Sequence, residues 1–358
     1  MDFLENIYIK EINSPDSERT AFGNEKLSNG TIQRTIIIDG NPFLPSSVLA
    51  DDEPLYNESF EAWVEEREKE LLLKADDLLK LYDNSTRFEK LKKSFSVNTL
   101  MPFIGAGMSM SSNYSGWTDF LKILRKESDV SEKVLLQLLE NGEYETAAQE
   151  IFEDLGEELF NEHLENEFSC EREISGSIHY LPILFPNQSI ITTNFDNILE
   201  RIYIGKDQGF DSTKSGKSLD EIMRQIAEGS RLLIKLHGDA RQVQDRVLTS
   251  SEYEEAYMEE TNLYKFFGRV LFKGSLLFLG CSLSSDRTIK TMISYVKKEG
   301  AKSLPRHFAF LEEIKDENKR KARKKELAKA NIFPIWYPEK EADVSIEALF
   351  LKLKEGIS

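Results

Sequence analysis

The sequence predicts an α/β protein with a doubly wound, Rossmann-like parallel sheet, and three observations support this fold class. Short apolar runs rich in β-branched residues alternate with longer helical patterns along most of the chain, which is the order of βαβ units. Several of these runs end in glycine, asparagine or histidine, as strands do where a parallel sheet faces a ligand. The 358 residues, 40% of them hydrophobic, suffice for one large domain with an extension.

The composition argues against several classes of protein. With 63 acidic and 46 basic residues, the net charge of −17 does not attract nucleic acid over the whole surface, so direct nucleic-acid binding is not expected. Cys170 and Cys281 lie far apart, which argues against a disulfide framework and against a zinc ribbon. No apolar run reaches the roughly 18 residues of a membrane helix. Because residues 1–20 also lack the pattern of a signal peptide, we expect a soluble, cytoplasmic protein.

Residues 1–84 are predicted to form an N-terminal extension. Residues 31–39 are typical of a strand, and a Gly-Asn-Pro turn signal follows them. The segment 45–54 begins near one proline and ends at another, which favours an irregular linker. A long helix is expected over residues 57–82, because their apolar side chains recur at helical spacing. Two interpretations of this helix stay open: it packs on its own domain, or it forms an oligomerisation arm.

Residues 85–358 carry the alternating pattern of the predicted sheet. A short helix over 84–94 leads into a first strand that ends near residue 104, and a helical module is expected over about 117–185. The remaining strands are predicted at 189–193, 231–236, 275–280, 307–311 and 332–336, with helices at 197–203, 219–228, 248–257, 263–272, 288–298 and 313–330.

Residues 101–109, MPFIGAGMS, resemble the end of a buried strand, a glycine-rich turn and the start of a helix. Gly105, Ala106 and Gly107 leave room for a ligand to approach the backbone, and Ser109 adds a hydroxyl. Successive N–H groups at a helix start can bind a phosphate. An ordinary tight connection between a strand and a helix needs the same small residues, so both interpretations stay open.

Small or polar groups stand at the ends of four predicted strands. These ends are Gly105-Ala106-Gly107, Thr193-Asn194, His237-Gly238 and Gly280-Cys281-Ser282. In a parallel sheet they would line one crevice at the carboxyl ends of the strands. Asn194 and Asp196 are also good helix-capping residues, and a histidine before glycine is also found at structural turns. A ligand site and a set of ordinary turns are therefore the two alternatives.

The motifs GAGMS, SGWTDF, ITTNFDNILE, IKLHGDA and LFLGCS occur in this order. The series resembles the sirtuin family, and most closely its branch in bacterial anti-phage defence. The resemblance covers about residues 91–310. It implies contacts with the phosphates and the adenosine side of NAD by Gly105, Ala106, Gly107, Ser109, Gly280 and Ser282.

The resemblance also assigns roles at the reacting end of NAD. It places Asp119 in a loop over the nicotinamide ribose, and it places Thr193, Asn194 and Asp196 near the nicotinamide. Asn194 would position the ribose and the attacking water. His237 would be the catalytic imidazole, acting as a general base, and an ordinary histidine pKa near 6.5 suits that work.

Two departures from the family pattern bear on the reaction. Thr118 and Leu121 replace the proline and the arginine of the family's nicotinamide-ribose loop, and the four zinc cysteines are absent. The loss of the zinc module disfavours a peptide deacylase. The defence branch cleaves NAD outright, so the resemblance implies an NAD hydrolase with NAD as substrate, no recycled cofactor and no zinc. An NAD-dependent deacylase and a non-catalytic sensor of NAD or ADP-ribose stay as alternatives.

Regulation and partners are expected from the same resemblance. An unregulated NAD hydrolase would harm its own cell, so an off state is expected, with activation by homo-oligomerisation or by a separate protein such as a HerA-type ATPase or another phage sensor. The lysine-rich and arginine-rich helix at 315–329 is a candidate contact in an otherwise acidic chain. It is a solvated helix face in the simpler interpretation, and a dock for an acidic neighbouring subunit in the other.

Overall fold

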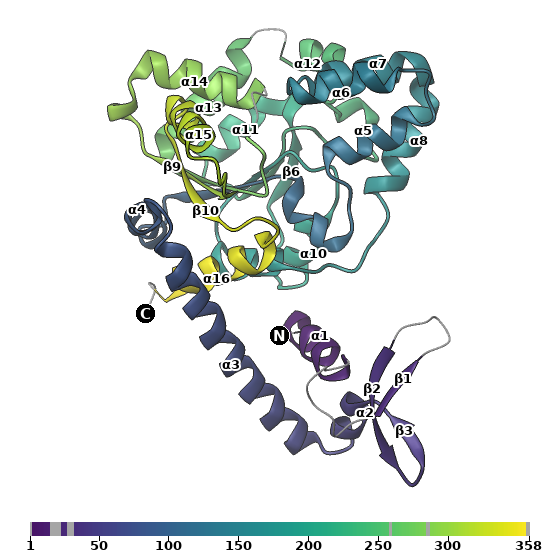
Figure 1. Cartoon of the computed structure of the whole chain (residues 1–358). Coiled ribbons are helices and arrows are strands. Elements are labelled where there is room, and N and C mark those ends of the chain that lie inside the picture. The colour runs from purple at the N-terminus through teal and green to yellow at the C-terminus, as the bar shows by residue number, and fades with distance from the viewer. Residues whose placement is uncertain (1, 15–22, 27–31, 258–259, 284–286, 356–358) are drawn as a thin grey trace. The chain divides into compact units, whose positions relative to one another are not determined.

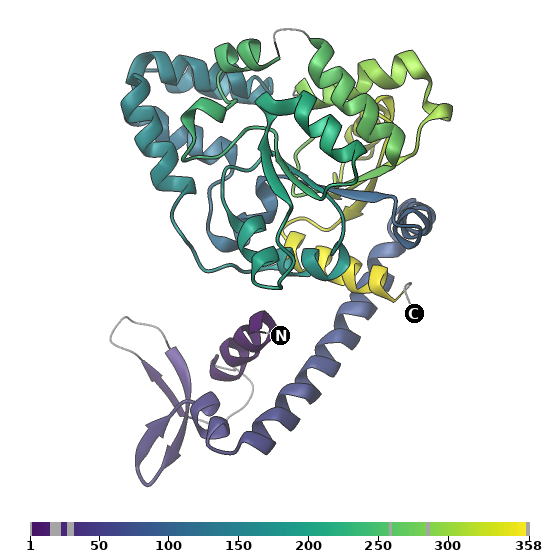
Figure 2. The same ribbon diagram turned by 180° about the vertical axis from the view of Figure 1, so that it is seen from behind.

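The computed structural model describes residues 2–14, 23–26, 32–257, 260–283 and 287–355. Clustering of contacts divides the chain into two compact units, Met1–Leu73 and Lys74–Ser358, which can be followed in Figures 1 and 2. Among the described residues, no helix is long and apolar enough to cross a membrane.

The first unit combines helices with a small antiparallel sheet. Its elements are α1 (Asp2–Asn13), β1 (Gly23–Lys26), β2 (Ile32–Ile38), β3 (Asn41–Phe43), α2 (Pro45–Ala50) and the first part of α3 (Glu53–Leu79). The strands pair in the order β1-β2-β3. The ring of Tyr8 in α1 lies 5.4–5.8 Å from the rings of Tyr56, Phe60 and Trp63 in α3. Aromatic packing therefore joins the two helices within this unit.

Predictions for the first unit are corrected at two places. The strand predicted at 31–39 is present as β2, although residue 31 lies outside the described residues. The segment 45–54 is not an irregular linker, because α2 occupies most of it. Pro45 stands in the first turn of that helix, where its missing N–H costs no hydrogen bond. For α3, the prediction began four residues late, at 57 instead of Glu53.

The second unit is built on a parallel sheet. Its strands are β4 (Leu100–Ile104), β5 (Ile190–Thr192), β6 (Ser212–Ser215), β7 (Leu232–Lys235), β8 (Ser275–Leu279), β9 (His307–Glu312) and β10 (Ile332–Tyr337). They pair in parallel in the order β10-β9-β8-β4-β5-β7-β6. The predicted doubly wound parallel sheet is confirmed. β6 was not predicted, because its sequence, Ser-Thr-Lys-Ser, is polar.

The helices of the second unit cover both faces of this sheet and form one group beside it. They are α4 (Asn84–Ser96), α5 (Trp117–Arg125), α6 (Glu132–Glu140), α7 (Tyr144–Leu155), α8 (Glu157–Phe168), α9 (Leu181–Leu184), α10 (Ile198–Ile204), α11 (Leu219–Ala227), α12 (Ser250–Ala256), α13 (Glu260–Lys273), α14 (Arg287–Glu299), α15 (Glu317–Lys329) and α16 (Ala342–Lys354). In Figure 1, α10 and α16 lie below the sheet, whereas α11, α13 and α14 lie above it. Helices α5–α8 form a separate group beside the sheet, between β4 and β5 in the chain.

The order of the strands reverses next to β4. From β4 the chain continues to β5 on one side, whereas β8 pairs with the other side of β4. The rings of Phe103 in β4 and Phe278 in β8 lie 4.9 Å apart between these neighbours. Ligands bind at such switch points, outside the carboxyl ends of the strands. The fold therefore places the turns after β4 and β8 at the expected position of a ligand site.

Candidate functional site

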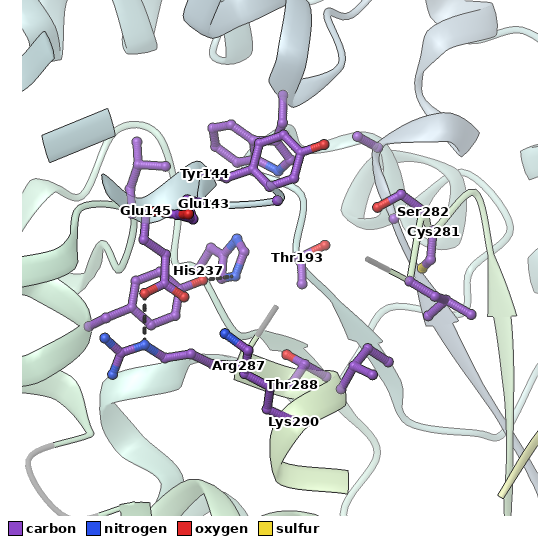
Figure 3. A pocket seen from close by; sticks show the side chains of 18 of the residues that line it. Glu143, Tyr144, Glu145, Thr193, His237, Cys281, Ser282, Arg287, Thr288 and Lys290 are labelled. Carbon is purple, nitrogen blue, oxygen red and sulfur yellow. Dashed lines mark hydrogen bonds and ion pairs between the residues drawn. The ribbon is translucent and has the colours of Figure 1, made fainter. Parts of the chain in front are cut away.

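A cavity of about 890 Å³ opens at the carboxyl ends of β4, β5, β7 and β8 (Figure 3). This volume lies within the range of about 300–1,000 Å³ that is common for ligand sites. Helices α5 and α7 of the helical group line its other side. The predicted site residues that line the cavity are Gly105, Ala106, Gly107, Asp119, Thr193, His237, Gly280 and Ser282.

The glycines of two turns allow the turns to pack against each other. A Cβ atom added to Gly105 would lie 2.6 Å from the carbonyl oxygen of Gly280, and one added to Gly107 would lie 2.9 Å from the Cα of Gly280. Gly280 itself has φ +64°, and an added Cβ would lie 2.4 Å from the nitrogen of Met108. Close packing of backbone therefore explains these small residues, whatever ligand the cavity holds.

The sequence predicts that the turn after β4 leads into a helix. This prediction is corrected, because no α-helix follows the turn directly. The turn forms two short 3₁₀ segments, Ala106–Met108 and Met110–Ser112. The N–H of Gly105 donates to the carbonyl of Leu279, and the N–H of Gly107 donates to that of Gly280. The N–H groups of Gly105 and Gly107 are therefore already hydrogen-bonded within the protein. The two 3₁₀ segments are too short to add much of a helix dipole. The turn provides room for a phosphate and few free N–H groups.

Asn194, Ser109 and Asp196 lie behind the cavity wall and are joined by hydrogen bonds. The Nδ2 of Asn194 donates to the hydroxyl of Ser109 at 3.0 Å and to the carbonyl of Gly105 at 3.2 Å. The hydroxyl of Ser109 donates to Asp196 Oδ2 at 2.8 Å. All three side chains are buried, and none is among the residues that line the cavity. Burial raises the pKa of Asp196, against the lowering effect of the Ser109 hydrogen bond.

The buried Lys235 joins the loops that follow β5 and β7. Its Nζ donates to the carbonyl oxygens of Phe195 and Asp196, and it pairs with Glu200 at 3.2 Å and Asp239 at 2.8 Å. Burial alone would lower the pKa of Lys235, but the two carboxylates outweigh it and the pKa is raised. This ammonium group therefore holds the loop of Asn194–Asp196 against the loop of His237–Asp239.

His237 follows β7, and its side chain faces the cavity. Its Nε2 lies 2.5 Å from the hydroxyl oxygen of Tyr253 in α12. Burial lowers the pKa of His237 to about 4, and a backbone hydrogen bond with Thr193 acts in the opposite direction. The imidazole is therefore neutral at physiological pH, and it can accept a hydrogen bond through its unprotonated nitrogen. The pKa near 6.5 that the sequence favoured is not that of the folded protein.

Sequence reasoning missed the side chains that helices bring to the cavity. Glu145 in α7 pairs with Arg287 in α14, with Oε2 and Nε 2.7 Å apart, and Figure 3 shows this pair beside His237. The guanidinium of Arg287 lies 5.2 Å from the ring centroid of Tyr253. Lys290, one turn along α14, also lines the cavity. No motif marks these residues in the sequence, because they lie within ordinary helical patterns.

Comparison with known proteins agrees with this geometry. A family model described as a SIR2-like domain matches residues 188–335, a segment that runs from the start of β5 into β10. Over this segment, which is less than half of the chain, the protein is similar to SIR2-like domains. The matched segment includes the loops of Asn194 and His237 and the turn at Gly280, so it contains three of the four strand ends at the cavity.

Three curated relatives of this chain carry the name NAD(+) hydrolase ThsA. The protein of Enterococcus faecium is 24% identical over 240 residues, which cover 66% of this chain and 48% of the relative. Those of Acinetobacter baumannii (strain 532279) and Bacillus cereus (strain MSX-D12) are 21% and 25% identical, covering 65% and 61% of this chain and 46% and 43% of the relatives. The chain thus spans about half the length of the curated relatives that it matches.

Proposed function

We propose that this chain hydrolyses the bond between nicotinamide and ribose in NAD, releasing nicotinamide and ADP-ribose. The observation that carries the proposal is the arrangement of Thr193, His237 and the glycine turns after β4 and β8 around one cavity at the switch point of the sheet. The names of the three relatives support the same reaction. NAD is then a substrate and not a recycled cofactor.

The proposed reaction resembles the hydrolysis of a glycoside. The electron pair of the glycosidic bond leaves with nicotinamide, and the ribose passes through an oxocarbenium-like transition state. Water then adds to the ribosyl carbon and loses its proton. We propose that neutral His237 accepts a hydrogen bond from a ribose hydroxyl or from this water. Asp119, on the cavity wall, would lie near the nicotinamide ribose, where a carboxylate stabilises the developing positive charge.

Asn194 is proposed to position the ribose and the attacking water, although its side chain lies behind the cavity wall. Its Oδ1 is buried without a hydrogen-bond partner in the described part of the chain. Such an atom is costly, and a ligand or a water that donates to it would remove the cost. Asp196 is held by the hydroxyl of Ser109 and by the N–H of Ile198. Each oxygen of this carboxylate keeps a further lone pair that could accept a hydrogen bond from the nicotinamide amide.

The cellular role proposed for the activity is anti-phage defence by depletion of cytoplasmic NAD. We propose that the enzyme stays off until it forms a homo-oligomer or until a separate phage-sensing protein, such as a HerA-type ATPase, activates it. Candidate contact regions are the N-terminal extension, 1–84, and the basic helix α15. The helical insertion at about 117–185 is proposed to take the place of the zinc module found in deacylases of the family.

The proposal is tested in bacteria that express the wild-type chain or His237→Ala and are then infected with phage. Mass spectrometry of the extracts measures NAD, nicotinamide and ADP-ribose. NAD is expected to fall and ADP-ribose to rise in infected wild-type cells but not in cells with the variant. Cleavage of NAD only with an acylated peptide would instead indicate a deacylase. If the purified chain binds NAD but no cleavage is found either in vitro or in infected cells, the chain would be a sensor.

A further inference from the structure

The pyrophosphate of NAD carries two negative charges, and the cavity offers few groups to neutralise them. Acidic side chains at the cavity are Asp119, Glu143 and Glu145. Among the described residues that line it, the cations are Arg287 and Lys290, since His237 is neutral. A protein with a net charge of −17 repels an anionic substrate over most of its surface. Positive charge at the cavity is therefore needed for tight binding of a dinucleotide.

The glycine turn does not supply this charge. The N–H groups of Gly105, Gly107, Met108 and Ser109 all donate to carbonyl oxygens of the protein. The hydroxyl of Ser109 donates to Asp196. A phosphate that approaches this turn gains space from the missing side chains, but it would have to break existing hydrogen bonds to gain these four donors.

Arg287 and Lys290 lie three residues apart in the first turns of α14, so their side chains share one face of the helix. Figure 3 shows Arg287, Thr288 and Lys290 on one side of the cavity, with the Lys290 ammonium group directed into it. Arg287 pairs with Glu145 at 2.7 Å. Burial raises the pKa of Glu145, whereas the charges of Arg287 and Lys290 lower it.

We propose that Arg287 and Lys290 bind the pyrophosphate of NAD, and that Glu145 holds the guanidinium of Arg287 in the cavity before the substrate enters. The guanidinium has further N–H donors beyond the Nε that contacts Glu145, and it can present them to phosphate oxygens. Lys290 acts as a second, flexible point charge. The inference deepens the proposed NAD hydrolysis and rests on it, because it names how the substrate's phosphates are recognised.

The test compares three variants with the same change in charge. Arg287→Gln and Lys290→Gln each remove a cation from the cavity. Lys297→Gln is the matched control, because it removes an exposed cation from the last turn of the same helix, away from the lining residues. Isothermal titration calorimetry with ADP-ribose is expected to show about tenfold weaker binding for each cavity variant and a change below about twofold for the control.

A second measurement uses nicotinamide riboside, which has the same scissile bond but no phosphate. The ratio of kcat/KM for NAD to kcat/KM for nicotinamide riboside is expected to fall about tenfold in Arg287→Gln and Lys290→Gln and to stay at the wild-type value in Lys297→Gln. Equal losses with both substrates would overturn the inference, because they would show a general defect of the site. Circular dichroism verifies that each variant is folded, and the exposed Lys290 allows a test even if Arg287→Gln does not fold.

The outcomes separate this inference from the proposed reaction. If the wild type cleaves NAD and the cavity variants bind ADP-ribose as tightly as the Lys297→Gln control, the inference is wrong and the hydrolase proposal stands. If the wild type never cleaves NAD but the cavity variants still lose affinity for ADP-ribose, the phosphate site stands and the hydrolase proposal is wrong.

Discussion

The hydroxyl oxygen of Tyr253 lies 2.5 Å from Nε2 of His237, and the two rings meet edge to face with their centroids 5.7 Å apart. The contact joins α12 to the loop after β7. A capping box at Thr249 fixes the first turn of α12, and the guanidinium of Arg287 lies over the tyrosine ring. Tyr253 therefore sets the orientation of the imidazole that we place at the centre of the proposed reaction.

Tyr253→Phe is predicted to lower kcat for NAD about tenfold with little change in KM, because the imidazole loses the hydrogen bond that orients it. Steady-state kinetics measure both constants. Tyr257→Phe is the matched control, since the Tyr257 hydroxyl donates to the carbonyl of Leu236 at 3.2 Å and not to the histidine. Equal losses of kcat in the two variants would show that Tyr253 has no special relation to His237.

The position of Asn194 behind the cavity wall leads to a second prediction. Asn194→Ala is expected to abolish NAD hydrolysis, whereas Ser109→Ala is expected to keep most of it. Ser109→Ala removes the donor to buried Asp196 and should lower the free energy of unfolding by about 1–3 kcal/mol. Urea denaturation and activity are measured on both variants. If Ser109→Ala loses as much activity as Asn194→Ala, the asparagine acts only through the structure of the network.

The packed glycine turns give a prediction for stability. Gly280 and Gly300 both have positive φ, but a Cβ at Gly300 meets nothing within 4 Å, whereas one at Gly280 meets the backbone of Met108. Gly300→Ala should therefore cost only about 1–2 kcal/mol of backbone strain. Gly280→Ala should cost at least about 2 kcal/mol more. Urea denaturation of the two variants measures the difference, and equal costs would contradict the close packing of the turns.

Stability is predicted to fall in mild acid because of buried histidines. Burial lowers the pKa of His307 to about 3, below the value near 6.5 of an unfolded chain. The unfolded state therefore takes up a proton that the folded state does not, and stability is lost as pH falls from 6.5 toward 3. His237 acts in the same direction, whereas buried Asp196, whose pKa is raised, acts in the opposite one.

Comparison with His307→Asn isolates one histidine from these opposing effects. The asparagine oxygen can replace Nδ1 as acceptor of the Leu276 N–H, and it does not titrate. Between pH 6 and pH 5, the free energy of unfolding of the variant should fall less steeply than that of the wild type, by up to about 1.4 kcal/mol per pH unit. Identical slopes would mean that His307 is not buried as a neutral imidazole.

The sheet could be predicted where strands are buried on both faces. β8, Ser-Leu-Leu-Phe-Leu, is buried at every position, and its apolar run is distinct from the helical patterns on either side. Within the described part of the chain, β6 pairs with β7 alone, at the edge of the sheet, and its residues are polar. Its strand conformation depends on that neighbour, because its own residues carry no apolar pattern. Two prolines favour a linker over 45–54, whereas Pro45 stands in the first turn of α2, where its missing N–H costs no hydrogen bond.

The sequence predicts those residues of the candidate site that directly follow a strand of the sheet. Parallel strands bring their carboxyl ends to one edge, so Thr193, His237 and Gly280 could be placed together from their strand positions. The direction of a side chain and its hydrogen bonds depend on packing. The sequence therefore does not indicate that the Asn194 side chain lies behind the cavity wall. Glu145 and Arg287 meet only because α7 and α14 reach the same cavity, and nothing local in either helix indicates this.

The most direct test of the hydrolase proposal follows NAD by proton NMR in extracts of phage-infected cells that express the wild-type chain or His237→Ala, so that an activating oligomer or partner can form. We predict that resonances of free nicotinamide and of ADP-ribose grow with the wild type as those of NAD decline, and that the variant leaves NAD intact while remaining folded. Binding of NAD by the wild type with no free nicotinamide formed, or equal cleavage by both proteins, would contradict the central role given to His237 in an NAD hydrolase.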